Sequence, residues 1–246
     1  MHYRYKIKNS QALKGLISHL KLQKADGIYT VEEQNATLVG CFSNHPLTPY
    51  QGAKLMSCDD NFIDWQDQWN HQEISVRLHN THFLLKPGAG FGDASHPTTQ
   101  LCLKALELTT APAVIDIGSG SGILSIAAHF LGVPAIFSIE IDEAACSHHR
   151  ENCKLNQLTE PVIFHDLAMI PLISCKPLIL INMILSEQKE ALKNCPPELL
   201  NKGIWYCSGI LKSDIDQAVK FYENLGLHVQ RIDTNGIWVG LALIGS

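Results

Sequence analysis

From about residue 97 onward, short apolar runs alternate with helical patterns, and this alternation limits the possible folds more than any other feature. The apolar runs predict buried strands at 113–117, 135–141, 162–165, 178–184 and 203–208. The helical patterns fall at 97–108, 123–131, 143–155, 186–194 and 213–225. Repeated strand–helix units predict a doubly wound α/β fold, a parallel sheet with helices on both faces.

The last two predicted strands break this pattern. They cover 228–234 and 237–243 and are joined by Asn235-Gly236, a strong signal for a two-residue hairpin turn. A seven-stranded sheet that closes with an antiparallel hairpin differs from the all-parallel dinucleotide-binding fold. It is similar to the architecture of Class I methyltransferases.

The domain plan has three parts. Residues 1–60 predict a small α+β appendage, with a strand at 3–8, a helix at 10–22 and strands at 27–32 and 36–42. Residues 61–86 are expected to be a linker. Trp65 and Trp69 within it are four apart and would share a helix face, which favours interdomain packing over a substrate cage. Residues 87–246 are expected to form the ligand-binding domain.

Composition excludes several classes of function. With 46% hydrophobic and 17% charged residues the chain should fold, and a net charge of -5 argues against general nucleic-acid binding. None of the eight cysteines forms a C-x-x-C pair, so no metal site is predicted. No signal-peptide core or membrane-length apolar run is present, which favours the cytoplasm. The oligomeric state stays unknown.

A glycine loop, Gly118-Ser119-Gly120-Ser121-Gly122, follows the 113–117 strand. Glycine permits positive φ in a sharp strand-to-helix turn and lets a ligand approach the backbone. Ile123 stands where a dinucleotide-binding G-x-G-x-x-G would need glycine. Glu140, 22 positions after Gly118, ends the next strand and can accept hydrogen bonds from ribose hydroxyls. A tight turn without a ligand is the alternative.

For the polar residues near the glycine loop and in the helix that follows Glu140, we expect structural roles. Asp142 is expected to cap the following helix, and Asp116 to order the glycine loop by accepting backbone N–H bonds. His148 and His149 are expected on an exposed helix face. Upstream, Gly90 and Gly92 flank Phe91, so this backbone can fold over a ligand while the ring covers it, or the segment simply caps the helix that starts at His96-Pro97.

Several segments in this order resemble one family. PGAGFGDASHPTTQLCLKALE, VIDIGSGSGILSIAA and IEIDEAA are similar to segments of the PrmA family of lysine methyltransferases, which modify a large-subunit ribosomal protein. ILINMIL, CSGIL and the D-W-x-x-x-W pattern at 64–69 are also similar, so the resemblance covers about 64–246.

The resemblance implies an S-adenosylmethionine site and roles for individual residues. Asn182 reaches the methionine part or the entering amine, and His96 acts as a base or, by preference, as a loop anchor. Asp166 meets the adenine amino group. The implied cofactor-binding set is Phe91, Thr98, Thr99, Gly118, Gly120, Gly122, Glu140, Asp166 and Asn182.

The N-terminal region departs from the family. The family carries a complete ferredoxin-like domain that grips the ribosomal protein, whereas residues 1–60 supply about half of one. We therefore expect a lysine or amino-group methyltransferase whose partner is a protein, such as a ribosomal protein, with no nucleic-acid or membrane partner. A different protein or small-molecule substrate, or a cofactor-binding scaffold with little activity, remain alternatives, and an NAD-dependent oxidoreductase is disfavoured.

Overall fold

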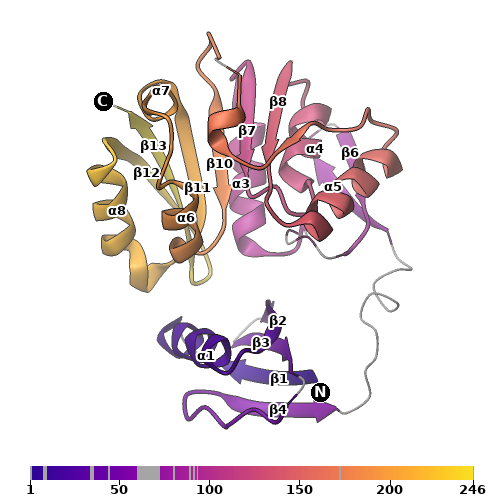
Figure 1. The fold of residues 1–246 in the computed structure, drawn as a ribbon, viewed down its shortest axis with the longest axis vertical. Helices are drawn as coiled ribbons and strands as arrows, with labels where there is room; N and C mark the ends of the chain where they lie inside the picture. Colours follow the sequence, from indigo (N-terminus) through magenta and orange to yellow (C-terminus); the bar gives the residue numbers. More distant parts are fainter. Residues whose placement is uncertain are drawn as a thin grey trace. The chain divides into compact units, whose positions relative to one another are not determined.

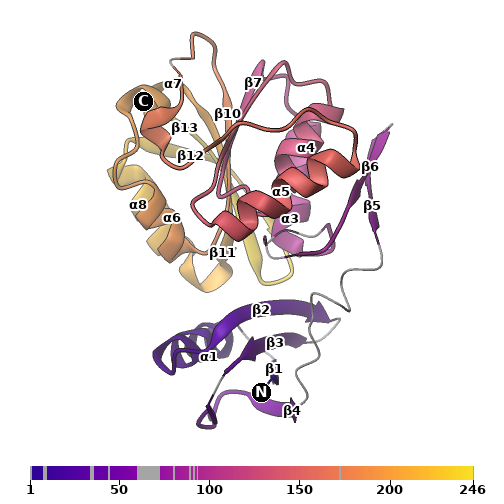
Figure 2. The same cartoon turned by 45° about the vertical axis from the view of Figure 1, so that its right-hand side comes forward.

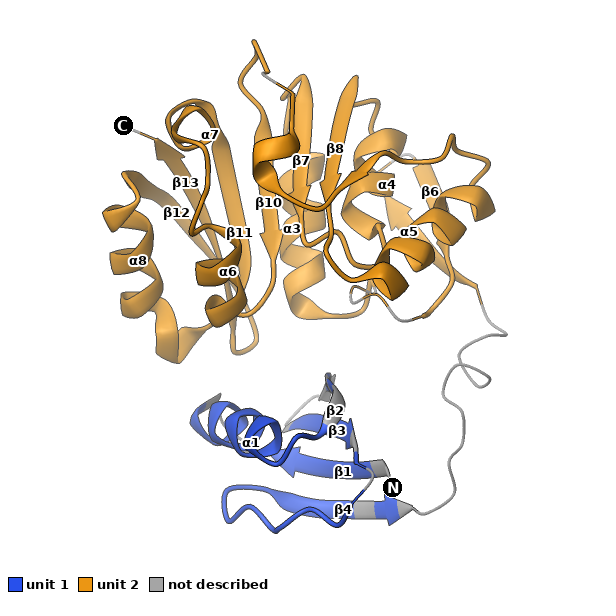
Figure 3. Cartoon of the chain, viewed as in Figure 1, with its two compact units in different colours: residues 1–65 blue, residues 66–246 orange. Residues whose placement is uncertain are grey.

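The computed structural model describes residues 2–7, 10–33, 36–43, 45–59, 73–79, 81–88, 90, 92, 94–171 and 173–245. The chain divides into two compact units, Met1–Trp65 and Gln66–Ser246 (Figure 3).

Unit 1 is a four-stranded sheet with one helix. Its elements are β1 (His2–Ile7), α1 (Ser10–Leu22), β2 (Asp26–Glu33), β3 (Ala36–Phe42) and β4 (Lys54–Asp59), and the antiparallel sheet has the order β2-β3-β1-β4. Buried side chains recur every second residue in β1 and every third or fourth in α1, as a strand and a helix with one packed face require. These side chains are Tyr3, Tyr5, Ile7, Leu13, Leu16 and Leu20.

The segment expected as a linker contains a hairpin. Strands β5 (Ile74–Leu78) and β6 (Thr81–Leu85) pair antiparallel within 61–86. They alternate buried and more exposed residues, and the buried ones join the core of unit 2. The structure therefore differs from the linker expectation over 74–85, because apolar side chains at every second position can pack one face of a hairpin onto a core.

Unit 2 is built on a seven-stranded sheet with the order β12-β13-β11-β10-β7-β8-β9. Strands β7 (Ala113–Ile117), β8 (Ala135–Ile139), β9 (Ile163–Phe164), β10 (Leu178–Asn182) and β11 (Ile204–Leu211) run parallel. Strand β13 (Trp238–Gly245) lies antiparallel between β11 and β12 (Leu227–Asn235). The predicted doubly wound sheet with an antiparallel C-terminal hairpin is confirmed.

Helices cover both faces of this sheet (Figures 1 and 2). Helices α3 (Pro97–Glu107), α4 (Ile123–Phe130) and α5 (Glu143–Leu155) and the β5–β6 hairpin contribute to one hydrophobic cluster. Helices α6 (Leu185–Ala191), α7 (Pro197–Lys202) and α8 (Ile215–Asn224) and the 3-10 helix η1 (Leu167–Met169) contribute to the other. Strand β10 is buried on both faces, with Leu178 and Leu180 in the first cluster and Ile179 and Ile181 in the second.

Candidate functional site

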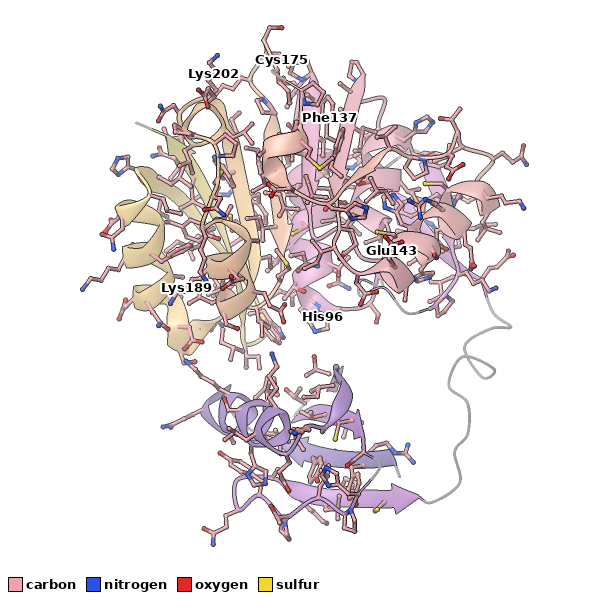
Figure 4. The ribbon with its side chains drawn as sticks, in the orientation of Figure 1. His96, Phe137, Glu143, Cys175, Lys189 and Lys202 are labelled. Carbon is pink, nitrogen blue, oxygen red and sulfur yellow. The ribbon has the colours of Figure 1, made fainter. Side chains whose placement is uncertain are left out.

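The predicted site residues gather at the carboxyl edge of the parallel strands, where ligands bind in open α/β sheets. His96 and Glu143 lie toward this edge of unit 2, and Cys175 and Lys202 lie at the opposite edge (Figure 4). The loop that follows β7 places three glycines here, all with positive φ: Gly118 (74°), Gly120 (54°) and Gly122 (80°). Any residue with a side chain would be strained at these φ values, so the backbone of this turn requires glycine at all three positions.

Close packing is a second reason for glycine. A Cβ at Gly118 would lie 2.7 Å from the Sδ of Met183, which follows β10, and a Cβ at Gly122 would collide with the His149 ring. A Cβ at Gly90 would collide with the backbone of Gly120. The upstream segment therefore lies directly against the glycine loop, although the two are separated by almost thirty residues of sequence.

Glu140 connects the glycine loop to the end of β8. Its Oε2 accepts a 2.9 Å hydrogen bond from the Gly120 amide. Its Oε1 accepts from the amides of Ile141 (2.8 Å) and Asp142 (3.0 Å). The predicted ribose-binding carboxylate thus points at the glycine loop. As predicted, Asp142 caps α5 by accepting from the amides of Ala144 and Ala145.

The start of α3 is organised by His96. Its Nδ1 accepts from the Thr98 amide and lies 2.7 Å from Thr98 Oγ1, so His96 is the N-cap of the helix. Its ring packs at 5.4 Å from the ring of Trp238. The buried ring and its capping bond favour the anchoring role over the role of a base.

Asn182, the last residue of β10, meets α3 inside unit 2. Its Nδ2 donates to Thr99 Oγ1 at 3.2 Å, and both side chains are buried. Its Oδ1 is also buried and has no hydrogen-bond partner among the described residues. A buried acceptor without a donor is costly unless a ligand or water supplies one. Asn182 therefore presents an acceptor beside the glycine loop.

Asp116 orders the helix, where the sequence predicted that it would order the glycine loop. Its Oδ2 accepts from the backbone amide and the hydroxyl of Ser125 in α4 (3.1 and 2.7 Å). The carboxylate lies on the side of β7 that faces α4, so it reaches the first turn of that helix. Burial raises the pKa of Asp116 to about 6, against the two Ser125 bonds that lower it.

The two histidines of α5 correct another expectation. Both were predicted on an exposed face, yet His148 is 5% and His149 0% exposed. His149 Nδ1 lies 3.1 Å from Ser119 Oγ in the glycine loop, and burial lowers the pKa of His149 to about 4. The sequence did contain a signal for the burial of His149, because this residue shares a helix face with the apolar residues Cys146, three before it, and Cys153, four after it. The polar residue type alone favours an exposed position, and the helical spacing outweighs it here.

The remaining predicted residues are less connected to this cluster. Asp166 is exposed and caps η1 through the Ala168 amide. Phe91, Trp65 and Trp69 lie outside the described residues. Within the described part of the chain, no group of three or more metal-ligating side chains occurs, and no helix is long and apolar enough to cross a membrane.

Comparison with protein families gives a match over residues 58–244 to the model of ribosomal protein L11 methyltransferase (PrmA). Curated relatives carry that same name. The Staphylococcus saprophyticus protein is 31% identical over 75% of this chain and 67% of its own length. The Staphylococcus haemolyticus protein is 35% identical over 72% of this chain and 64% of its own. The Geobacter metallireducens protein is 35% identical over 63% of this chain and 51% of its own length. The chain spans about half to two thirds of the length of these relatives.

Solved structures agree on the fold. The ribosomal protein L11 methylase from Lactobacillus delbrueckii subsp. bulgaricus superposes with a TM-score of 0.56 at 25% identity, covering 66% of this chain and 84% of that one. The M. jannaschii tRNA m1G37 methyltransferase gives a TM-score of 0.51 at 12% identity with full coverage of both chains, a likeness of fold alone.

Proposed function

The chain belongs to the ribosomal protein L11 methyltransferase (PrmA) family, and from this premise we propose that it methylates an amino group of a protein with S-adenosylmethionine as the methyl donor. A large-subunit ribosomal protein is the first candidate substrate, and a lysine side chain the first candidate group. The activity would then lie in the cytoplasm, with the ribosomes. Support for this proposal comes from the residues at the carboxyl edge of the sheet.

The residues present fit the cofactor of Class I methyltransferases. Gly118 and Gly120 have positive φ and no Cβ, which permits the sharp turn and lets a ligand approach the loop backbone. The Glu140 carboxylate can exchange its bonds to backbone amides for bonds to two ribose hydroxyls. Thr99 and Asn182 would border the methionine part, with Thr98 holding the helix start. Asp166 would meet the adenine amino group.

The observation that carries the proposal is the unpartnered Oδ1 of Asn182. This oxygen can accept a hydrogen bond from the N–H of an entering amine and so aim the nitrogen lone pair. Thr99 fixes the amide by accepting from Nδ2, which leaves Oδ1 as the free acceptor. Burial of a lysine amine lowers its pKa, so the amine can enter in its neutral form without a strong dedicated base.

Positioning supplies most of the chemistry in such a transfer. When bound, S-adenosylmethionine supplies a methyl group on a positive sulfur, which an amine displaces in line. The transfer would form a nitrogen–carbon bond as the carbon–sulfur bond breaks, and the amine would then lose a proton to solvent. Holding nucleophile and methyl group in line can supply a large part of the rate. His96 would contribute by holding the start of α3, and with it Thr99, in place.

Two measurements test the proposal. Calorimetry should detect S-adenosylmethionine binding to the wild-type chain and about 100-fold weaker binding to Glu140→Ala, because a carboxylate with several bonds is removed. Glu143→Ala, which removes an exposed carboxylate in the first turn of α5, is the matched control. Undiminished binding by Glu140→Ala would overturn the ribose assignment.

The second measurement follows radiolabelled methyl groups into ribosome-containing and ribosome-depleted extracts. We expect label in a ribosomal protein and about 100-fold less with Asn182→Ala, while Asn201→Ala on the surface of α7 keeps full activity. Label that enters only the depleted extract would show another substrate. Cofactor binding with no label in either extract would favour the scaffold alternative.

A further inference from the structure

Two side chains of α5, His148 and Asn152, and that of its C-cap residue Asn156 form a ladder along the end of β6 and the backbone that follows it. Asn156 bonds both backbone groups of Leu84, accepting from its amide at 2.8 Å and donating to its carbonyl at 2.7 Å. One turn earlier, Asn152 Oδ1 accepts from the Lys86 amide at 2.8 Å. Residues spaced by four lie on one face of a helix, so these side chains can bond successive backbone groups of one neighbouring segment.

His148 is the last rung of this ladder. Its Nδ1 accepts from the Gly90 amide at 3.0 Å, and its Nε2 donates to the Lys86 carbonyl at 2.6 Å. An amide only donates and a carbonyl only accepts, so both bonds together require a neutral ring with its proton on Nε2. The ring packs against Gly88, where a Cβ would lie 2.6 Å from it. Burial lowers the pKa of His148, which favours the neutral form.

The same ladder reaches the glycine loop. Asn152 Nδ2 donates to the Ser121 carbonyl at 2.9 Å, and Ser121 Oγ donates to the Gly92 carbonyl at 2.7 Å. The Gly90 backbone lies directly against Gly120. The His148 bond to Gly90 thus helps to set where the Gly90 backbone meets the loop that the proposed function assigns to the cofactor.

We propose that His148 is a positioning residue for cofactor binding, which fixes the Gly90 backbone against the glycine loop by bridging Lys86 and Gly90. This inference rests on the proposed function. It assigns no contact between His148 and the cofactor. The charged and titratable groups that face the ring are Lys86 from the segment and Glu151 and His149 from its own helix. Protonation would place a hydrogen on Nδ1 and break the Gly90 bond, so the ring holds the Gly90 amide only while His148 is neutral.

Substitutions that separate the two ring nitrogens provide the test. His148→Phe keeps a ring against Gly88 but removes both bonds, and it should weaken S-adenosylmethionine binding about tenfold at pH 8, chiefly through faster dissociation. His148→Asn places an acceptor near the position of Nδ1 and should recover part of this loss. His82→Phe makes the same change at an exposed histidine of β6 and should leave the affinity unchanged.

The pH dependence gives a readout that a purely structural role would not produce. Wild-type affinity should fall as the pH is lowered through the ionisation of His148, and the affinity of His148→Asn should not show that step. If His148→Phe fails to fold, the asparagine variant and the wild-type pH series decide the question. If wild type and His148→Phe bind S-adenosylmethionine with equal affinity, or if the pH step persists in His148→Asn, the inference is wrong while the proposed function stands. No wild-type binding at any pH overturns it together with the proposed function.

Discussion

At the scale of single residues, the chain offers two glycines in nearly the same backbone conformation but in different surroundings. Gly118 has φ of 74° and faces Met183, whereas Gly132 has φ of 79° and nothing within 4 Å of the point where a Cβ would lie. Both would suffer the same backbone strain on substitution by alanine. Only Gly118 would also press a methyl group against Met183, the residue that follows Asn182 in the proposed site.

Gly118→Ala and Gly132→Ala should therefore both reduce stability and should differ in their effect on binding. Each should lower the free energy of unfolding by at least about 1 kcal/mol, because alanine tolerates left-handed backbone poorly, and Gly118→Ala should cost more because the Met183 side chain must move. Only Gly118→Ala should lower the affinity for S-adenosylmethionine, by at least about tenfold. Urea denaturation and calorimetry on both variants check this. Equal affinities would show that the glycine at 118 serves the turn alone.

His149 predicts a pH effect on stability. Its pKa falls from 6.5 to about 4 in the fold, so between these values the unfolded chain binds the extra proton. Stability is then lost as the pH falls from 6.5 toward 4, by up to about 3 kcal/mol. Asp116 acts in the opposite direction, because its pKa rises from 3.8 to about 6 and its contribution is lost as the pH rises through that value.

Comparison with His149→Phe isolates the histidine contribution. As the pH is lowered from 6.5 to 5, the free energy of unfolding of wild type minus that of the variant should fall steadily. Asp116 is present in both proteins, so its contribution cancels in this difference. If this difference between wild type and His149→Phe does not change with pH, burial of His149 is not the cause of the pH effect.

At the scale of elements, the turn after β10 is held by a buried glutamine of α6. Gln188 Nε2 donates to the carbonyls of Met183 (2.6 Å) and Ser208 (2.8 Å), and its Oε1 accepts from the Tyr222 hydroxyl of α8. This side chain therefore ties α6 to the ends of β10 and β11 and to α8. It also fixes the residue that follows Asn182.

Gln188→Leu should consequently reduce both stability and activity. Removing the amide leaves buried carbonyls and a hydroxyl without partners, which should cost about 3 kcal/mol of unfolding free energy. Because the Asn182–Met183 turn loses its support, the methylation rate should fall more than the cofactor affinity. Gln217→Leu on the exposed face of α8 is the control. Denaturation curves and initial rates measure the two effects, and an unchanged rate would separate Gln188 from the site.

Sequence patterns predicted the elements of unit 2 well and their side-chain partners poorly. Buried strands such as β7 and β10 are short, continuously apolar and bounded by turn residues, so a local window contains their whole signal. The β5–β6 hairpin carries a weaker, alternating signal. Asp142 was predicted as a cap because its partners are two and three residues away. The bonds of His148 reach back about sixty residues, and no local pattern specifies them.

At the scale of the whole molecule, each unit has its own core, and every described residue assigned to the cofactor belongs to unit 2. Among the described residues, the two hydrophobic clusters of unit 2 draw their members from unit 2 alone, and unit 1 buries its own strand and helix side chains. Binding of the cofactor and recognition of a protein substrate should then be separable functions.

A fragment covering 66–246 should therefore fold cooperatively and bind S-adenosylmethionine within about twofold of the full chain, because it keeps both clusters and the glycine loop. If unit 1 recognises the protein substrate, as the domain prediction expects, methylation should fall through a raised KM. Calorimetry and initial rates on fragment and full chain measure the two effects. Unchanged methylation would place substrate recognition entirely in unit 2, and a folded fragment without cofactor affinity would show that unit 1 takes part in the cofactor site.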